Sequence, residues 1–413
     1  MNAASRDPWQ WRDLVRREID LPRTVLELPL DDAVGRVVGA EVASPEDLPS
    51  TPIAAMDGFA VRRADLAAGS VTLPVSSEIP ARPGAIGELA RGTAARIMTG
   101  APVPGGADVV VEVEATDADP FGPSPRTVTL SLQEVPAARR HIRGVGEEVS
   151  SGEVLARPGD RVGAGLVGLL RALGVETLPV ERALAVGIVV TGDELVGTAG
   201  RAEVGAVRES NGEMLGAALR ADGIEARAVH STDTHADLTA ALEEAAAHSD
   251  LVLTTGGIGH GAYDVVKTLL GERGSGGSRF EHLRLRPGGP QGFGHLADGT
   301  AVIHLPGTPV GALVGHHLFV RPLLVGERAA PRRVLRGAAD PLPRPRRAGV
   351  LHALPGRLRH DSHGRECVDL LPGRRLAPYG RADAIVLLGG ADGAGSPEAA
   401  GTVPEETVLI LPL

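Results

Sequence analysis

The feature that most constrains the fold is an alternation of apolar runs and amphipathic helices between residues 183 and 325. Residues 184–191 form a continuous apolar run, which is typical of a strand covered on both faces. The alternation continues with strands expected at 224–229, 251–255 and 301–305 and helices expected at 211–221, 236–247, 264–270 and 310–319. Strands that alternate with helices predict an α/β domain with a parallel, doubly wound sheet.

Outside this region the sequence predicts smaller elements and β-rich domains. A short amphipathic helix is expected at 9–20, and another at 164–173. Residues 45–140 are dense in glycine, proline and short β-branched runs, which predicts a β-rich domain. Strands expected at 384–388 and 408–411 predict a small C-terminal β domain. A chain of 413 residues has room for about two to four such domains.

Composition points to a cytoplasmic protein without a membrane partner. No apolar run approaches the ~20 residues that a membrane-spanning helix needs. The first thirteen residues are polar where a secretory signal would be apolar. Cys367 is the single cysteine and cannot form an internal disulfide, which fits a reducing compartment.

The charge pattern argues against a nucleic-acid partner. The net charge is −10, and no basic stripe dominates the chain. The one basic cluster, 332–347, is rich in proline and lacks aromatic residues, so we interpret it as a solvated linker. Lys267 is the only lysine among 42 basic residues. A lysine retained in such a composition suggests a need for a compact, strongly hydrated charge.

Three turns follow the carboxyl ends of predicted strands, at the edge where open α/β sheets bind ligands. They are Thr191-Gly192-Asp193-Glu194, the glycine-rich residues 254–261, and Pro306-Gly307-Thr308-Pro309. Glycines in the second turn allow backbone N–H groups to face an anion, and the helix that follows adds its positive end. The alternative is a tight turn whose glycines serve only backbone geometry.

Three carboxylates near these turns raise the question of a metal. Glu194, Asp233 and Asp264 each follow an expected strand or turn. Mg²⁺ prefers one or two carboxylates together with phosphate oxygens, so this set is suited to hold a metal against a phosphorylated ligand. Alternatively, Asp233 and Asp264 cap the helices that follow them, and Glu194 is simply solvated.

Longer segments carry a resemblance to a known family. Residues 52–61 read P-I-A-A-M-D-G-F-A-V, residues 96–104 read R-I-M-T-G-A-P-V-P, and residues 190–195 read V-T-G-D-E-L. Together with 141–149, 256–267 and 305–322, these segments resemble, in order, the molybdopterin molybdotransferases, which include the bacterial MoeA proteins and the E domain of gephyrin.

The resemblance implies a domain organisation that agrees with the predicted elements. It divides the chain into an elongated linker domain (8–45 and 141–180), a β-rich inserted domain (46–140), an α/β molybdopterin-binding domain similar to the MoaB and Mog proteins (181–325) and a C-terminal β domain (326–413). It also implies a homodimer whose active site lies between the α/β domain of one subunit and the β-rich domain of the other.

The resemblance also implies a reaction: Mg²⁺-dependent cleavage of adenylylated molybdopterin (molybdopterin-AMP), with molybdate as the second substrate, to form molybdenum cofactor. Carried over by position, the catalytic set is Asp57, Glu194, Asp233, Asp264 and Lys267. The implied metal ligands are Glu148, Glu194, Asp233 and Asp264. Substrate and phosphate binding falls to Thr99, Thr191, Gly192, Gly256, Gly257, Gly259, Gly261, Arg286, Pro306 and Gly307.

Six positions depart from the family pattern. Two of them are Arg286 in place of a lysine and Thr308 in place of an asparagine. Glu148 replaces an aspartate of the family, which places the carboxylate on a longer side chain. A serine is replaced by Gly259, a lysine by Gly289, and another serine by Gly311. Each lost hydrogen bond to a charged group weakens anion binding by roughly 1.5–3 kcal/mol. Candidates to compensate are Arg286, His260 and His304.

Three functions therefore remain open. The first is a molybdotransferase with an altered molybdate pocket. The second is a molybdopterin adenylyltransferase-like enzyme, because residues 254–259 read T-T-G-G-I-G, closer to T-T-G-G-T-G of that sister family. The third is a non-catalytic molybdopterin-binding paralogue that acts as a scaffold, which has less need of clustered carboxylates. The thirteen histidines are scattered, and we expect core or surface positions rather than metal ligands.

Overall fold

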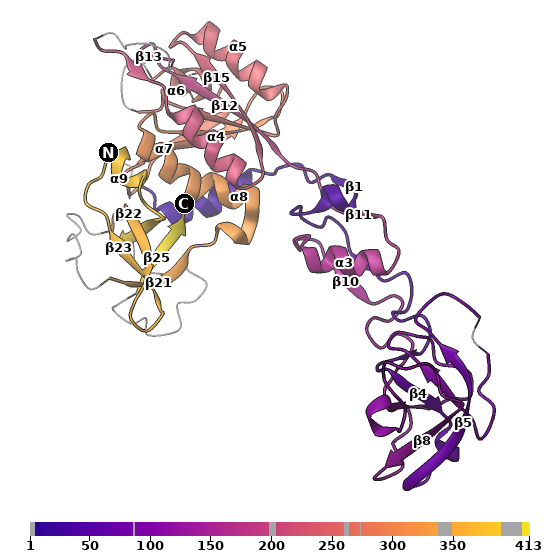
Figure 1. Cartoon of the computed structure of the whole chain (residues 1–413). Helices are drawn as coiled ribbons and strands as arrows, with labels where there is room; N and C mark the ends of the chain where they lie inside the picture. Colours follow the sequence, from indigo (N-terminus) through magenta and orange to yellow (C-terminus); the bar gives the residue numbers. More distant parts are fainter. Residues whose placement is uncertain are drawn as a thin grey trace. The chain divides into compact units, whose positions relative to one another are not determined.

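The fold is described from a computed structural model that covers residues 5–85, 87–197, 204–259, 264–272, 274–337, 349–389 and 407–413. The chain divides into two compact units. One unit comprises the chain up to Arg23 and from Ala183 onward, and the other is Thr24–Arg182. Figure 1 shows the elements of each unit.

The first unit contains the predicted α/β domain. Its parallel strands are β15 (Glu225–Ser231), β12 (Ala185–Thr191), β16 (Leu251–Thr255) and β20 (Ala301–Leu305), adjacent in that order. The helices are α4 (Asn211–Ala221), α5 (His235–Ala246), α6 (Val265–Leu270) and α7 (Pro309–Gly315). These elements confirm the predicted alternation. A short parallel ladder, β13 (Leu195–Val196) with β14 (Val207–Arg208), follows β12.

Helices cover both faces of this sheet, as expected of a doubly wound domain. Side chains of β12 alternate between two apolar cores: Val186, Ile188 and Val190 pack in one core, and Val189 packs in the other. The first core also receives α4 and α7, and the second receives α5 and α6. The helix α1 (Pro8–Glu18) packs in the first core. There the rings of Trp11 and Phe293 are in edge-to-face contact, with 5.0 Å between their centroids.

Two further strands extend the sheet and were not predicted. β19 (Pro290–His295) runs antiparallel to β20, and β17 (Ser278–His282) runs antiparallel to β19. The sequence of β19, P-Q-G-F-G-H, has little intrinsic preference for a strand. Its glycines are needed for close packing, since a Cβ at Gly294 would lie 2.0 Å from the carbonyl oxygen of Gly277.

The helix predicted at 310–319 is interrupted. After α7 the backbone forms a π-helix over His316–Val320, labelled η3, and continues as α8 (Arg321–Val325) and the 3₁₀ turn η4 (Gly326–Ala329). His316 and His317 are buried in this segment, which confirms the expectation of core histidines. Burial lowers the pKa of His316 to about 4, so its ring is neutral in the folded protein at neutral pH.

The C-terminal part of the first unit is a closed β-sheet. Its strand order is β18 (Leu285–Arg286), β22 (Leu351–His360), β23 (Glu366–Leu370), β21 (Arg332–Arg336), β25 (Thr407–Pro412) and β24 (Ala384–Gly389), and β24 also pairs with β22. The short helix α9 (Leu376–Tyr379) packs beside it. The strands predicted at 384–388 and 408–411 are confirmed as β24 and β25.

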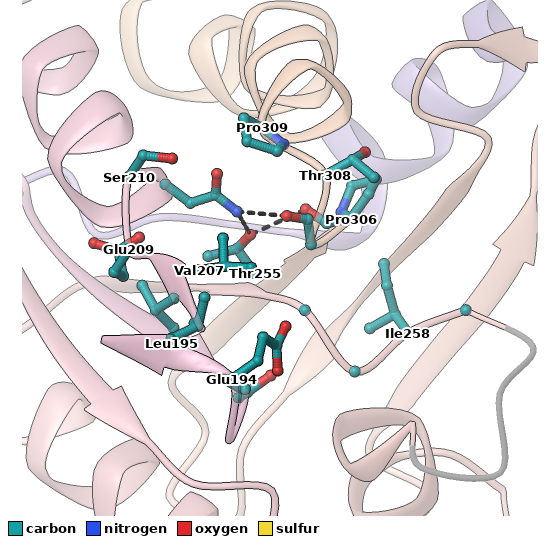
Figure 2. Close-up of a pocket in the computed structure, with 18 of the residues that line it drawn as sticks. Glu194, Leu195, Val207, Glu209, Ser210, Thr255, Ile258, Pro306, Thr308 and Pro309 are labelled. Carbon is teal, nitrogen blue, oxygen red and sulfur yellow. Dashed lines mark hydrogen bonds between the residues drawn. The ribbon is translucent and has the colours of Figure 1, made fainter. Parts of the chain in front are cut away.

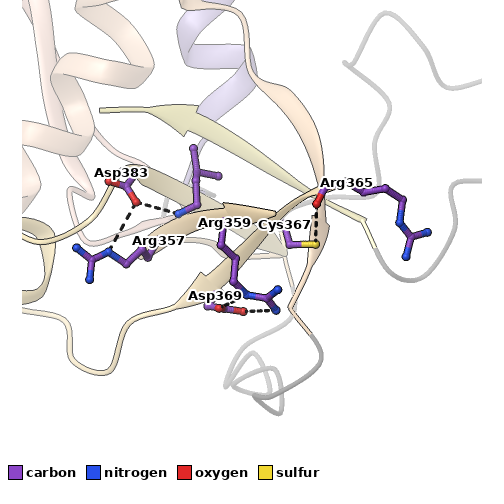
Figure 3. Close-up of polar contacts among 7 residues, drawn as sticks. Arg357, Arg359, Arg365, Cys367, Asp369 and Asp383 are labelled. Carbon is purple, nitrogen blue, oxygen red and sulfur yellow. Dashed lines mark hydrogen bonds and ion pairs between the residues drawn. The ribbon is translucent and has the colours of Figure 1, made fainter. Parts of the chain in front are cut away.

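Ion pairs lie on the surface of this sheet. Arg359 contacts Asp369 across β22 and β23, with 2.5 Å between Nε and Oδ2, and Arg357 faces Asp383 at 4.0 Å (Figure 3). Exposed pairs of this kind contribute little stability. Cys367, on β23 near Arg365 in Figure 3, is buried, as a small apolar residue would be. The prediction of a linker at 332–347 is wrong for Arg332–Arg336, which form β21, and residues 338–347 lie outside the described residues.

The second unit is β-rich, as predicted for residues 45–140. Its five-stranded sheet has the order β7 (Val109–Glu112), β4 (Gly58–Val61), β6 (Ala94–Ile97), β5 (Gly69–Ile79) and β8 (Thr127–Leu132). Three small antiparallel ladders accompany it: β1 (Val25–Pro29) with β11 (Thr177–Glu181), β2 (Val42–Ala43) with β10 (Val154–Ala156), and β3 (Ile53–Ala54) with β9 (Ile142–Arg143).

Short helices complete the second unit. They are α2 (Leu30–Ala33), α3 (Ala164–Ala172) and the 3₁₀ turns η1 (Arg63–Asp65) and η2 (Val113–Ala115). The helix α3 confirms the one predicted at 164–173. Among the described helices of the chain, none is both long and apolar enough to cross a membrane.

Candidate functional site

A cavity of about 630 Å³ opens at the carboxyl ends of β12, β16 and β20 (Figure 2). The three turns singled out in the sequence all contribute to its lining. The predicted site residues that it brings together are Thr191, Gly192, Glu194, Asp233, Gly256, Gly257, Gly259, Asp264, Pro306 and Gly307. Residues that the sequence did not single out as site residues also line it, among them Arg208, Glu209, Ser210 and Asn211.

Close packing of the loops explains the glycines of the second turn. Gly256 has φ +104°, and a Cβ there would lie 2.6 Å from Thr191 Oγ1 and 2.7 Å from the Thr191 carbonyl oxygen. Gly257 also has a positive φ, +62°. A Cβ at Gly307 would lie 3.2 Å from the Cα of Gly256. Side chains would therefore separate loops that now touch, and strain the backbone as well.

The side-chain amide of Asn211, the first residue of α4, joins two of these loops. Asn211 Nδ2 donates to Thr255 Oγ1 over 2.9 Å and to the carbonyl oxygen of Gly307 over 2.8 Å. Thr255 Oγ1 in turn donates to the carbonyl oxygen of Pro306 over 3.0 Å (Figure 2). The N-cap position of α4 belongs to Ser210, whose side chain makes no capping bond. Only a polar residue at the start of a helix signalled this role in the sequence.

The three carboxylates near the turns all line the cavity, and the capping alternatives fail for two of them. The N-cap of α5 is Thr234, whose hydroxyl accepts from the N–H of Asp237, so Asp233 is not the cap. Asp264 stands at the N-cap position of α6 without a capping bond, and its Oδ2 is buried without a partner. Glu194 is exposed, which agrees with solvation.

The electrostatics around Asp233 are repulsive. Partial burial raises the pKa of Asp233, and the negative charges of Asp193 and Glu194 add to the increase. Asp193 and Asp233 are also linked through their backbones: the N–H of Asp233 donates to Asp193 Oδ1 over 2.9 Å, and the N–H of Asp193 donates to Asp233 Oδ2 over 3.3 Å. Carboxylates held close together in this way favour the binding of a cation.

Other predicted site residues lie apart from this cavity or outside the described residues. Lys267 is exposed on α6, where its Nζ donates to the carbonyl oxygen of Gly259 over 3.4 Å. Glu148 belongs to the second unit and is exposed. Gly261 and His260 are not among the described residues. Within the described ranges, no group of three or more His, Cys, Asp or Glu side chains is arranged to hold a metal ion.

Asp57 and Thr99 lie together in the second unit. Thr99 donates to Asp57 Oδ1 twice, from its N–H over 2.6 Å and from its hydroxyl over 2.7 Å. These bonds lower the pKa of Asp57, the backbone bond having the larger effect. The next residue, Gly58, begins β4, and a Cβ there would lie 2.0 Å from the Val111 carbonyl oxygen. The glycine thus lets β4 pack against β7 and holds Asp57 at the exposed end of the strand.

The three glycines that replace larger residues of the family differ in the space available for a side chain. A Cβ at Gly289 would lie 2.4 Å from Cε1 of His282, so the imidazole occupies the space of a longer residue. A Cβ at Gly311 would lie 2.6 Å from Thr308 Oγ1, whereas one at Gly259 would make only ordinary contacts, 3.5 Å from the Asp264 carboxylate.

Of the residues proposed to replace the lost anion-binding donors, Arg286 is exposed near the cavity and His304 is buried in the core. Arg286 is exposed on β18, two residues before Gly288, which lines the cavity. His304 is fully buried, and both ring nitrogens are hydrogen-bonded, to Thr254 Oγ1 at 2.8 Å and to Ser278 Oγ at 2.9 Å. Burial lowers its pKa to about 3. His304 is therefore part of the core, and the suggestion that it compensates for a lost donor is wrong.

Comparison with known proteins gives matches along most of the chain. Residues 10–174 match the family described as MoeA N-terminal region (domain I and II), and residues 187–325 match the probable molybdopterin binding domain. The chain is 39% identical over 337 residues to molybdopterin molybdenumtransferase 2 of Mycobacterium tuberculosis, covering 79% of each protein. It is 32% identical over 318 residues to the molybdopterin molybdenumtransferase of Haemophilus influenzae, covering 76% of each.

The fold is also found among solved structures. The molybdopterin biosynthesis MoeA protein of Pyrococcus horikoshii OT3 superposes with a TM-score of 0.78 at 23% identity, over 99% of this chain and 100% of that one. At that identity the similarity establishes the fold of the chain and nothing finer.

Proposed function

Because this chain belongs to the molybdopterin molybdenumtransferase family, we propose that it catalyses Mg²⁺-dependent cleavage of adenylylated molybdopterin with insertion of molybdate. The chain is thus a transferase of molybdenum cofactor biosynthesis. The cavity at the strand ends is the proposed site of the pterin substrate, molybdate being the second substrate.

One observation carries the proposal: carboxylates from three loops line the same cavity as a glycine-rich turn. Glu194, Asp233 and Asp264 supply oxygen ligands, which Mg²⁺ prefers. The turn at Gly256 and Gly257 brings backbone into the cavity without side chains. The N–H of Gly256 donates to the carbonyl oxygen of Leu305 over 3.2 Å, so the phosphate oxygens would be met by the N–H groups that follow Gly256 in the turn. A site with both features suits a phosphorylated ligand that arrives with a divalent cation.

The donor set fits Mg²⁺. Asp264 Oδ2 is buried without a protein partner, and a buried carboxylate oxygen is normally bonded or bound to a cation. Partial burial raises the pKa of Asp233, and the negative charges of Asp193 and Glu194 add to the increase; a cation would relieve this repulsion. The three carboxylates are not arranged as a ready three-ligand site in the described residues, and Mg²⁺ usually takes one or two carboxylates together with water and phosphate oxygens. Asp264 and Asp233 would hold the ion together with the substrate phosphate, and Glu194 would add negative charge at the exposed side. The ion would supply electrophilic polarisation of the phosphoanhydride.

Protein groups perform the remaining tasks in this proposal. Thr191 and the glycine-rich turn orient the phosphate, and Pro306 and Gly307 form the part of the wall next to that turn. Lys267 is placed on α6 beside Gly259, where its charge would attract the leaving phosphate. Arg286 would attract molybdate from the edge of the cavity. Asp57, Thr99 and Glu148 belong to the second unit and are proposed to act from there.

We also propose that the protein is a cytoplasmic homodimer with an active site shared between subunits, as the family resemblance implies. A mixing experiment tests this: an Asp57→Ala variant and an Asp264→Ala variant are each inactive, and a mixed dimer regains activity at one of its two sites. Sedimentation of the unmixed protein checks the dimer. Mixtures that stay inactive, although subunit exchange is demonstrated, would contradict a shared site.

The direct test of the function follows release of AMP. Purified protein is incubated with adenylylated molybdopterin, and Mg²⁺ and molybdate are varied independently. Release that depends on both ions is the expected result. Asp264→Asn should raise the Mg²⁺ concentration for half-maximal rate about tenfold or more, since it removes a charged ligand. The exposed Asp20→Asn is the matched control.

Other outcomes point to the two alternatives. Transfer of AMP from ATP to molybdopterin would favour the adenylyltransferase-like function, to which the T-T-G-G form of residues 254–257 is similar. Tight binding of the substrate without release of AMP would favour a non-catalytic scaffold.

A further inference from the structure

The orientation of the Asn211 amide is fixed by its partners. The carbonyl oxygen of Gly307 can only accept a hydrogen bond, so the amide atom 2.8 Å from it must be the NH₂ group. The same nitrogen donates to Thr255 Oγ1, whose own proton is given to the Pro306 carbonyl oxygen. Both amide protons of Asn211 are therefore used within the protein, and its oxygen is left as a pure acceptor.

That oxygen has no donor in the described structure. Asn211 is only 7% exposed, and its Oδ1 is buried without a hydrogen-bond partner. Buried amide oxygens are normally bonded, so an unpartnered one in the lining of a cavity indicates a donor that comes from a ligand. Two more unpartnered buried atoms, Thr191 Oγ1 and Asp264 Oδ2, belong to residues that line the same cavity.

Arg208 and Glu209 both line the cavity near Asn211, and the acceptor Oδ1 itself disfavours an anion at this point. Glu209 lies two residues before Asn211 and accepts from the N–H of Gly212, so its carboxylate lies at the start of the same helix (Figure 2). Glu194 lines the cavity on the β12 side. An unpartnered acceptor oxygen on the same helix end as the Glu209 carboxylate would repel phosphate or molybdate oxygens, whereas an N–H group would be attracted.

We infer that Asn211 Oδ1 accepts a hydrogen bond from an N–H group on the pyrimidine edge of the pterin. This inference rests on the proposed function, which makes a pterin the ligand. The pterin edge carries an exocyclic amino group at C2 and a ring N3–H, both donors, and phosphate and molybdate oxygens offer none. Asn211 thereby separates the two ends of the substrate: the pterin head binds at α4, and the phosphate lies at the glycine-rich turn.

For a ligand N–H group to reach Asn211 Oδ1, the rim of the cavity at Thr308 and Pro309 must open slightly. Less than 1 Å² of Oδ1 is exposed, and Thr308 and Pro309 form part of the cavity wall near Gly307 (Figure 2). Thr308 is exposed, so its loop has room to shift. The Asn211 amide stays anchored by its bond to Thr255, at the end of β16, while the rim moves.

Three soluble probes test the inference by binding. They are 6-hydroxymethylpterin, its lumazine analogue with oxygen in place of the C2 amino group, and its N3-methyl analogue without the ring N–H. Wild-type protein should bind the pterin about tenfold more tightly than at least one analogue, because a site built around a hydrogen bond rejects a ligand that lacks it. The analogue that binds poorly identifies the N–H group used.

Substitutions distinguish recognition of the pterin by Asn211 from a purely structural role of its amide. Asn211→Ala should abolish the preference among the probes, and Glu213→Ala, an exposed residue on the same helix, should leave it unchanged. Thr255→Val removes one anchor of the amide but keeps Oδ1, so it should weaken all three probes by a similar factor and retain the preference. Thermal unfolding of each variant shows whether it is folded.

Two results would overturn the inference: no preference in the wild-type protein, or a preference that persists unchanged in Asn211→Ala. Either result together with normal release of AMP leaves the proposed function intact. Absence of both pterin binding and turnover would overturn the inference and the proposed function together.

Discussion

Thr99 places two donors on a single carboxylate oxygen of Asp57. Its N–H lies 2.6 Å and its hydroxyl 2.7 Å from Oδ1. Both bonds favour the ionised carboxylate and lower the pKa of Asp57. Since the folded pKa is below the ordinary value, the pair stabilises the fold above the ordinary pKa of aspartate, and this contribution is lost as pH falls through the lowered pKa.

Thr99→Val should raise the pKa of Asp57 only part of the way to its ordinary value. The hydroxyl bond is lost, but the stronger backbone bond is retained. NMR titration of the Asp57 carboxyl carbon measures the change. Thr72→Val is the control, because its hydroxyl bonds to Thr129 on another strand of the same unit. An unchanged pKa of Asp57 in Thr99→Val would contradict the assigned cause.

Gly256→Ala should destabilise the protein and impair substrate binding. The substitution combines an unfavourable φ of +104° with a Cβ 2.6 Å from Thr191 Oγ1, and we expect a loss of about 1–3 kcal/mol in the free energy of unfolding. Gly223→Ala is the matched control, since it has φ +79° but no atom within 4 Å of the added Cβ. Urea unfolding of both variants isolates the effect of the clash. Equal losses would show that the contact with Thr191 adds no penalty.

Asp193→Asn should lower the pKa of Asp233. It removes one of the negative charges that raise this pKa, while burial, the larger cause, remains. The acid limb of Mg²⁺-dependent turnover should therefore move to lower pH. The raised pKa also means that stability is lost as pH rises through it, so the variant should be at least as stable as the wild type near pH 7. An acid limb that does not move would separate Asp233 from metal binding.

Gly289→Lys should be poorly tolerated unless His282 is reduced in size. The added Cβ would lie 2.4 Å from the His282 ring. We expect the single variant to lose about 1–3 kcal/mol of stability and the double variant with His282→Ala to recover part of it. Denaturant unfolding of the four proteins gives the coupling energy. Additive effects would indicate that the ring moves aside at no cost.

The α/β domain was predictable because β12, β16 and β20 are continuous apolar runs and amphipathic segments separate them. β19 was missed because Gly292 and Gly294 have low strand preference and it is fixed by pairing with β20. β17 was missed with it, because β17 pairs only with β19 in this sheet. β21 was missed because Arg332–Arg336 is basic and follows proline.

The site was predictable in part for a similar reason. Turns that end parallel strands must meet at one edge, so the residues that gather there could be named in advance. Asn211 could not, because its role depends on Thr255 and Gly307, which are distant in sequence. The obstacle at Gly289 came from His282, seven residues earlier, at the end of β17, a strand that was not predicted.

The helix α4 is tied at both ends to the same stretch of chain. Its first residue, Asn211, bonds to Gly307, and its C-cap, Asp222, forms a two-point ion pair with Arg321, with 2.6 Å between Arg321 Nε and Asp222 Oδ2. Gly307 and Arg321 stand before and after α7 and the π-helix. A helix fastened in this way cannot fray from either end, so its backbone amides should exchange with solvent in one concerted opening, and a ligand that engages Asn211 would slow that exchange along all of α4.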